Sequence, residues 1–277
     1  MVLKDNFKGN LLAGKKGLIM GVANDKSIAW GIAKACAAQG AALGFTYQGD
    51  VFKKRVEPLV NSLGGSPVMI ECDATDEAAL DKTFADIEKK WGSFDFLVHA
   101  IAFSNKEELK GRYCDTTLEN FTNTMHISCY SFTSIARRAA KLMTNGGAMI
   151  TLTYIGSERV MPNYNVMGVA KAALEASVRY LAADFGEQNI RVHALSAGPM
   201  KTLAGSAIAN ARYTFRTAEE TAALHRSVTL EELGNTSVYL LSDMSSGTSG
   251  EVHYVDAGFR AMGMLPPWRI VSDGDAE

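Results

Sequence analysis

Short apolar runs alternate with longer amphipathic or alanine-rich segments along most of the chain. The short runs have the length of buried strands, and the segments between them place apolar residues at helical spacing. We predict strands at 18–20, 43–47, 68–70, 96–98, 149–152, 192–195 and 252–255. We predict helices at 27–39, 76–91, 117–143 and 164–186. Regular alternation of this kind indicates a parallel sheet with helices on both faces, joined by right-handed crossovers.

The helix predicted from Asp76 onward carries the clearest signal. Its apolar residues fall at i, i+4, i+7 and i+11, which is one face of a helix, and they are Leu80, Phe84, Ile87 and Trp91. Gly92 follows at the position where a glycine commonly ends a helix. Near the end of the chain, the sequence from Thr229 to Glu232 fits a capping box, which marks the start of another helix.

The chain of 277 residues is long enough for two domains at about 150 residues each. Strand and helix nevertheless alternate about seven times with no break in composition, internal repeat or low-complexity linker. We therefore predict one domain over 1–277, an α/β doubly wound Rossmann-type fold with a seven-stranded parallel sheet. Within it, 199–216 is predicted to cover the substrate or to pack as a core helix. The polar, acidic tail 266–277 is predicted to be disordered or to dock on a partner subunit.

Composition and charge exclude several classes of protein. A net charge of −2, from 28 basic and 30 acidic residues, lacks the basic excess of a general nucleic-acid binder. The chain has no apolar run long enough to span a membrane and no signal-peptide core, so we expect a cytoplasmic protein. The cysteines show no spacing typical of a metal site, and we predict no metal and buried free thiols in a reducing compartment. They are Cys36, Cys72, Cys114 and Cys129.

The segment 21–31 connects the first predicted strand to the first predicted helix, where folds of this class bind a pyrophosphate. The G-x-G-x-x-G spacing is absent, so an ordinary turn remains the alternative. Gln48 stands at the next strand end, where a carboxylate would bind a ribose diol. Residues 53–55 are basic and fit either a 2′-phosphate site or a solvated helix face. Asp73 after the third strand is placed to accept the adenine amino hydrogen or to cap a helix, and the residues alone leave NAD and NADP open.

The segment from Tyr154 to Lys171 carries the most informative chemistry. Tyr154 ends the fifth predicted strand and Tyr164 opens the next helix. Lys171 follows Tyr164 by seven residues, about two turns on one helix face. A lysine there favours the tyrosinate, which lowers the pKa of the tyrosine, and it can donate to ribose hydroxyls. Beside a nicotinamide, the pair would supply a proton donor and its organiser. For an isolated pair of this spacing, a packing tyrosine and a surface lysine are the alternative.

Several motifs together resemble the bacterial NADH-dependent enoyl-acyl-carrier-protein reductases, an atypical branch of the short-chain dehydrogenases/reductases. They are Gly-Val-Ala-x3-Ser-Ile-Ala-x-Gly at 21–31, Tyr-Gln at 47–48, Glu-Arg-x2-Pro-Asn-Tyr-Asn-x-Met-Gly-x-Ala-Lys-Ala at 158–172 and Ser-Ala-Gly-Pro-Met-Lys-Thr-Leu-Ala at 196–204. The resemblance covers about Leu11 to Gly263. It implies reduction of the trans-2,3 double bond of an enoyl thioester in fatty acid elongation, NADH rather than NADPH as cofactor, and a homotetramer.

The resemblance also assigns site residues. The catalytic residues are Tyr154, Tyr164 and Lys171. The cofactor-binding residues are Gly21, Ser27, Ile28, Gln48, Asp73, Ala74, Ile101, Lys171, Met200, Lys201, Thr202, Leu203 and Ala204. The substrate-binding residues are Ala102, Phe103, Ser104, Tyr154, Tyr164, Met167 and Ile208. Tyr164 is expected to donate a hydrogen bond to the enolate oxygen, whereas Tyr154 is left to donate a proton, position water or shape the pocket.

Departures from the family pattern are expected to tune binding without abolishing the chemistry. They are Ala100 for serine, Ala102 for glycine, Ser104 for alanine and Lys201 for arginine. The methyl group of Ala102 is expected to narrow the pocket. The acidic carrier protein needs a basic landing site, for which Arg212 and Arg216 are the candidates.

Two other functions are weighed against this one. A carbonyl reductase or alcohol dehydrogenase of the same superfamily usually has a Tyr-x3-Lys pair and a serine about thirteen residues before the tyrosine. Here Gly168 stands at the lysine position and Thr151 at the serine position, which disfavours that activity. A non-catalytic redox sensor would not need the proton donor that the pair of Tyr164 and Lys171 provides.

Overall fold

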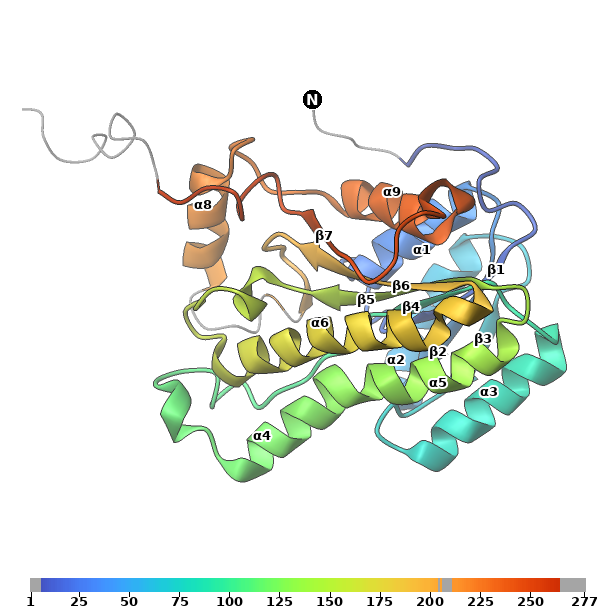
Figure 1. The fold of residues 1–277 in the computed structure, drawn as a ribbon, viewed down its shortest axis with the longest axis horizontal. Coiled ribbons are helices and arrows are strands. Elements are labelled where there is room, and N and C mark those ends of the chain that lie inside the picture. Colours follow the sequence, from blue (N-terminus) through green and yellow to red (C-terminus); the bar gives the residue numbers. More distant parts are fainter. Residues whose placement is uncertain (1–5, 204, 206–210, 265–277) are drawn as a thin grey trace, which may run out of the picture.

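The computed structural model describes residues 6–203, 205 and 211–264, which form an α/β fold around one parallel sheet (Figure 1). The strand order is β3-β2-β1-β4-β5-β6-β7, and every neighbouring pair is parallel. The strands are β1 (Lys16–Met20), β2 (Ala42–Tyr47), β3 (Val68–Glu71), β4 (Phe96–His99), β5 (Gly147–Thr153), β6 (Ile190–Ala197) and β7 (Val252–Val255). The seven predicted strands and the predicted fold class are confirmed.

Helices cover both faces of the sheet, α1 and α9 on one face and α3, α5 and α6 on the other (Figure 1). The helices are α1 (Ile28–Ala38), α2 (Gly49–Ser62), α3 (Glu77–Trp91), α4 (Leu118–Met125), α5 (Ser131–Leu142), α6 (Asn165–Phe185), α8 (Ala211–Thr221) and α9 (Leu230–Leu241). The chain runs outward from β1 to β3 and returns to β4 on the other side of β1. The strand order therefore reverses between β1 and β4, which is where folds of this class bind ligands.

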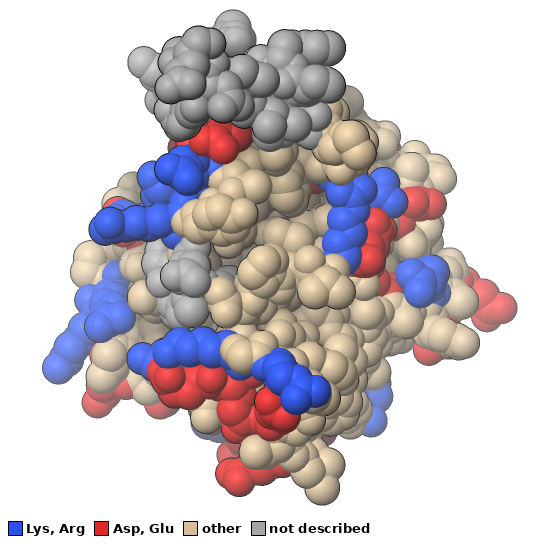
Figure 2. Space-filling view, turned by 90° about the vertical axis from the view of Figure 1, so that its left-hand side faces the viewer, with Lys and Arg blue, Asp and Glu red and all other residues tan. Residues whose placement is uncertain are grey.

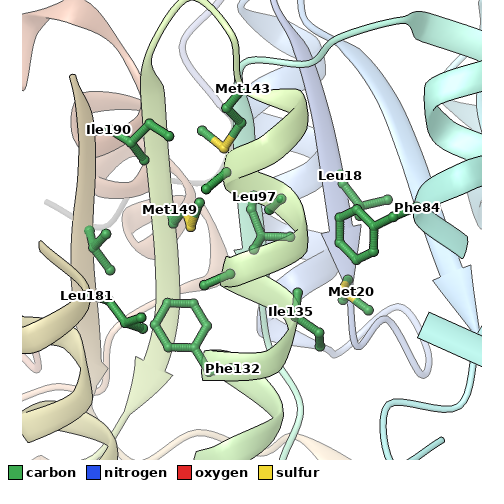
Figure 3. Packing of buried hydrophobic residues seen from close by; sticks show 14 of the residues in the cluster. Leu18, Met20, Phe84, Leu97, Phe132, Ile135, Met143, Met149, Leu181 and Ile190 are labelled. Carbon is green, nitrogen blue, oxygen red and sulfur yellow. The ribbon is translucent and has the colours of Figure 1, made fainter. Parts of the chain in front are cut away.

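Successive residues of a strand point to opposite faces of the sheet and belong to two separate hydrophobic cores. Leu18 and Met20 of β1 pack with α3 and α5 on one face, whereas Ile19 packs with α1 and α9 on the other. Figure 3 shows the first core, in which Phe84 of α3 and Phe132 of α5 lie against the sheet. Two-sided burial explains why the strands appear in the sequence as continuous apolar runs without polar alternation.

The predicted helix ends are confirmed where capping residues marked them. Asp76 precedes α3, and its carboxylate accepts hydrogen bonds from the N–H groups of Ala78 and Ala79 at 2.8 and 3.2 Å. Gly92 ends α3 with a φ of 72°. The capping box is present at the start of α9, where Thr229 and Glu232 bond each other's backbone N–H groups. The predicted set of helices lacks α2, although the reading of 53–55 as a helix face was correct.

The long helical segment predicted at 117–143 contains an irregularity that the sequence did not indicate. A π-helical turn, His126–Tyr130, separates α4 from α5. Such turns widen a helix by one residue and occur frequently at functional sites. This turn directs Ser128 toward the backbone of Phe103, described with the site below.

The prediction that all four cysteines are buried is wrong for Cys114. Cys36, Cys72 and Cys129 are buried, but Cys114 is exposed in a short 3-10 turn, Tyr113–Asp115, in which no residue is buried. All four thiols are free. In the part of the chain that the structure describes, no helix is both long and apolar enough to cross a bilayer. The tail 266–277 lies outside the described residues, as do positions 204 and 206–210 of the predicted cover at 199–216.

Candidate active site

A cleft of about 1020 Å³ opens at the carboxyl ends of β1, β4, β5 and β6. Its walls come from the loops that follow these strands, together with α8. Figure 2 looks at this end of the molecule, where uncharged side chains occupy the middle and basic side chains lie on either side. A mostly apolar cleft at the point where the strand order reverses is the default binding site of this architecture.

The turn between β1 and α1 is built to approach a ligand closely. Gly21 has a φ of 98°, and a Cβ atom there would lie 2.1 Å from the carbonyl oxygen of Ala100. The Ser27 hydroxyl accepts hydrogen bonds from the N–H groups of Ala23 and Asn24, both at 3.0 Å. Its side chain therefore closes the turn and does not cap α1. Ser27 and Ile28 line the cleft, so the N-terminus of α1 is available for an anionic group such as a pyrophosphate.

Two of the predicted adenosine contacts meet at the ends of β2 and β3. The side-chain amide of Gln48 donates to the Asp73 carboxylate at 2.8 Å, and the backbone and hydroxyl of Thr75 donate to the same carboxylate at 2.8 and 2.7 Å. Partial burial opposes ionisation of Asp73, but these hydrogen bonds lower its pKa overall. Ala74 lies beside Asp73 on the same edge. The edge therefore presents a fixed, charged acceptor.

The three predicted catalytic residues converge on the cleft. Tyr154 follows β5 and Tyr164 immediately precedes α6, and their rings meet edge to face with centroids 5.0 Å apart. Lys171 is buried on α6, seven residues after Tyr164, and its Nζ donates to the carbonyl oxygen of Leu152 at 2.8 Å. All three line the cleft. The sequence prediction that these side chains act together is consistent with this geometry.

The prediction that the pKa of Tyr164 is lowered is wrong, because its pKa is raised. Burial raises the pKa of Tyr164, and Tyr154 and Glu175 raise it further. Burial also raises the pKa of Tyr154. Spacing along the helix suggested an attraction between cation and tyrosinate, but desolvation dominates at this depth. Both phenols therefore remain protonated near neutral pH and are hydrogen-bond donors.

Comparison with known proteins identifies the family of this site. The family model described as enoyl-(acyl carrier protein) reductase matches residues 21–260, which include all the residues that line the cleft. The chain belongs to this family. The sequence-based resemblance is thus confirmed, and the chain is an oxidoreductase of the enoyl reductase type.

Individual relatives match the reductase over nearly its whole length. The enoyl-acyl-carrier-protein reductase (NADH) 1 of Rhizobium meliloti (strain 1021) is 59% identical over 254 residues, 92% of this chain and 93% of that protein. A crystal structure of the Anaplasma phagocytophilum reductase in complex with NAD is 55% identical with a TM-score of 0.91, and covers 95% of this chain and 100% of that one. The Bacillus cereus reductase, crystallised with NADP+ and indole naphthyridinone, is 46% identical with a TM-score of 0.91, and covers 92% of this chain and 100% of that one.

The reductase positions Tyr164 with residues that the sequence analysis did not identify. A Cβ atom on Gly156 would lie 2.4 Å from Cδ1 of Tyr164, so the ring fits only beside a glycine. Asn163 and Asn165 flank the tyrosine with φ angles of 58° and 36°. Asparagine tolerates this left-handed region better than other non-glycine residues. Their signal in the sequence was the Asn-Tyr-Asn triplet, which was used only as a family motif.

The predicted substrate rim is held in place by the π-helical turn and α4. The Phe103 N–H donates to Ser128 Oγ at 3.0 Å, and the same hydroxyl donates to the Phe103 carbonyl oxygen at 3.0 Å. Ser104 Oγ accepts a hydrogen bond from Thr124 at 2.8 Å and also bonds Asn120. Because Ser128, Asn120 and Thr124 lie far from the rim in sequence, spacing gave no signal for them. Ala102 and Phe103 are exposed in the cleft, as are parts of Ile101 and Ser104.

The remaining predicted site residues divide between two places. Met167, Met200, Thr202 and Leu203 line the main cleft. Lys201 is exposed and borders a neighbouring depression of about 310 Å³. The predicted cofactor contact Ala204 and substrate contact Ile208 lie outside the described residues. Among the described residues, no group of three or more histidine, cysteine or acidic side chains is placed to hold a metal ion.

The predicted docking residues both lie on α8 at the mouth of the cleft. Arg212 and Arg216 are exposed, while Phe215 between them is buried and lines the cleft. Arg216 pairs with Glu220 one turn later, with Nε and Oε1 3.6 Å apart. Arg212 forms no ion pair with another described residue, so it is the more available of the two arginines.

Proposed function

We propose that this chain reduces the trans-2,3 double bond of enoyl thioesters carried on acyl carrier protein, with NADH as the hydride donor. The observation that carries the proposal is the convergence of a buried tyrosine, a half-buried tyrosine and a buried lysine on the cleft that also contains the N-terminus of α1. The curated relatives are named for the same activity. It places this reductase in fatty acid elongation.

The cleft fits a nicotinamide dinucleotide. Gly21 lets the turn after β1 pack closely against the backbone of Ala100 at the edge of the cleft, and α1 offers its N-terminus to a pyrophosphate. Asp73, held charged beside Gln48, supports NADH over NADPH, because a 2′-phosphate near this edge would be repelled. Basic residues 53–55 do not oppose this choice strongly, since Lys53 Nζ lies over the Tyr47 ring at 5.9 Å from its centroid. When bound, NADH would supply the hydride.

The residues of the chain stabilise the charge that hydride addition creates. As negative charge grows on the thioester oxygen, the Tyr164 hydroxyl donates a hydrogen bond to it, and this bond is stronger in the transition state than in the ground state. Tyr154 packs against the Tyr164 ring and helps to keep Tyr164 protonated. One of the three N–H groups of the Lys171 ammonium donates to the Leu152 carbonyl oxygen, which leaves two to donate to ribose hydroxyls.

The acyl chain and the carrier protein would meet different parts of the same opening. Leu109, Met167 and Phe215 provide apolar walls for the acyl chain. Arg212 and Arg216 at the mouth would meet the acidic carrier protein, and the whole-chain charge of −2 means that attraction must come from such a local patch. We further propose a cytoplasmic homotetramer, supported by the free thiols and the family resemblance, and size-exclusion chromatography with light scattering tests the tetramer.

The activity is tested with the purified full-length chain. NADH oxidation is followed with crotonyl and longer enoyl thioesters, and separately with ketones and, in the reverse direction with NAD, alcohols. We expect turnover of enoyl thioesters alone, with NADH preferred to NADPH. Failure to reduce any enoyl thioester would refute the proposal, and turnover of ketones instead would favour the carbonyl reductase alternative.

A further inference from the structure

A buried carboxylate behind the active site has no part in the mechanism described so far. Glu175 lies on α6, one turn after Lys171, and is 7% exposed. Its Oε1 accepts a hydrogen bond from Thr153 Oγ1 at 2.5 Å. Thr153 is the last residue of β5, and the residue before it, Leu152, accepts the hydrogen bond from Lys171. Glu175 and Lys171 therefore form hydrogen bonds with adjacent residues at the end of β5.

Burying a carboxylate is costly unless an opposite charge or hydrogen bonds compensate for it. One neutral hydroxyl gives partial compensation, and the cation on the same helix face is Lys171. The two side chains form no direct ion pair in the described structure. The Glu175 carboxylate nevertheless raises the pKa of Lys171, and in a poorly solvated region charges interact more strongly than in water.

The other titratable groups around Lys171 are neutral near neutral pH. Burial and, to a smaller extent, the charge of Lys171 lower the pKa of His99 on β4 to about 3. Burial raises the pKa of Cys129, which reaches Lys171 from the π-helical turn. Tyr154, Tyr164 at the start of α6 and Tyr254 on β7 also have raised pKa values. Among the described residues around Lys171, Glu175 is thus the anion that can hold its ammonium group.

We propose that Glu175 is a positioning residue whose carboxylate keeps Lys171 charged and, through Thr153, fixes the end of β5, so that Glu175 sets the upper pH limit of NADH binding. The inference rests on the cofactor role proposed above for Lys171. Burial lowers the pKa of Lys171 to about 8, and Glu175 acts against that shift. Removing the charge of Glu175 therefore lowers the pKa of Lys171 further, and the ammonium group is lost nearer to neutral pH.

The test is the dissociation constant of NADH, measured by fluorescence titration between about pH 6 and pH 10. For the unaltered protein, the constant should rise above pH about 8. Glu175→Gln keeps the size and the acceptor for Thr153, and should move this rise about one pH unit lower. Thr153→Val keeps the charge and should leave the midpoint in place. Glu231→Gln on α9, which removes an ion pair with Lys34 of α1, is the matched control and should behave as the unaltered protein.

Two further variants separate this inference from the proposed function. Lys171→Met should weaken NADH binding and remove the rise, and if it binds NADH normally, the cofactor role of Lys171 is wrong. If Lys171→Met weakens binding while Glu175→Gln keeps the unaltered midpoint, only the role of Glu175 is overturned. If Glu175→Gln does not fold, the double variant Lys171→Met/Glu175→Gln replaces it in the test. Neither charge is present in the double variant, so it should bind NADH as Lys171→Met does. Weaker binding by the double variant would overturn the proposal.

Discussion

The two ends of the cleft are built by different physical means. At the nucleotide end, Ser27, Gln48 and Asp73 are tied to neighbouring groups by hydrogen bonds, and the one carboxylate there has a lowered pKa. At the chemical end, Tyr164 and Lys171 are buried. Burial raises the pKa of Tyr164 and lowers that of Lys171, so it favours the neutral form of each side chain. Hydrogen bonds at the nucleotide end favour the charged form of Asp73, whereas burial at the chemical end disfavours the charged forms of Tyr164 and Lys171.

This difference shows how the reductase can separate affinity from reactivity. Fixed hydrogen-bond geometry at the nucleotide end binds a ligand without depending on the reaction. A protonated phenol in a dry site gains little until negative charge develops on the substrate, and its stabilisation is then specific to the transition state. Changes to the two tyrosines of the chemical end should therefore alter kcat, whereas changes at the nucleotide end, and to Lys171 through its proposed ribose contact, should alter NADH affinity.

The largest expected effect comes from Tyr164→Phe. The change removes the hydroxyl but keeps the ring that packs on Tyr154, so kcat with an enoyl thioester should fall by about 10²–10³. The dissociation constant of NADH should change by no more than about twofold, because no ribose contact is lost. Stopped-flow reduction and fluorescence titration measure the two quantities. Tyr180→Phe, on the exposed face of the same helix, is the control. Equal losses of rate and affinity would contradict the separation of the two ends.

A smaller effect is expected from Gly156→Ala, which tests whether the tyrosine needs its place as well as its hydroxyl. The added Cβ atom would lie 2.4 Å from the Tyr164 ring and push it from its position. A displacement on the ångström scale should lower kcat by about tenfold to a hundredfold, with NADH affinity retained. Gly247→Ala has no atom within 4 Å of its new Cβ and is the matched control. An unchanged kcat would show that the ring tolerates displacement.

How far the sequence could predict the site depended on the kind of signal. Local capping residues predicted both ends of α3, and the apolar runs predicted the sheet, because each signal is contained within a few residues. The meeting of Tyr154, Tyr164 and Lys171 followed from their places at a strand end and along one helix. The family resemblance supplied their roles.

Features that depend on tertiary approach escaped prediction. Gly156 is constrained by a ring eight residues away in sequence, and Ser128 by a loop that the π-helical turn brings near. The pKa direction of Tyr164 was predicted wrongly because spacing reveals a neighbouring cation but not the depth of burial, which here decides the sign. Exposure of Cys114 was missed because the four cysteines were treated alike, although polar and charged residues flank Cys114 in the sequence.

The smallest effect is expected at the nucleotide end, from Ser27→Ala. The change removes both acceptor bonds that close the turn after Gly21, each worth about 1 kcal/mol, and the turn must then be ordered when the ligand binds. The dissociation constant of NADH should rise about tenfold, while kcat at saturating NADH should stay within about twofold. Ser62→Ala removes a hydroxyl bonded only within the exposed end of α2 and should change neither quantity. A fall in kcat at saturating NADH would mean that the turn also sets the position of the nicotinamide, so that the two ends of the cleft are mechanically coupled.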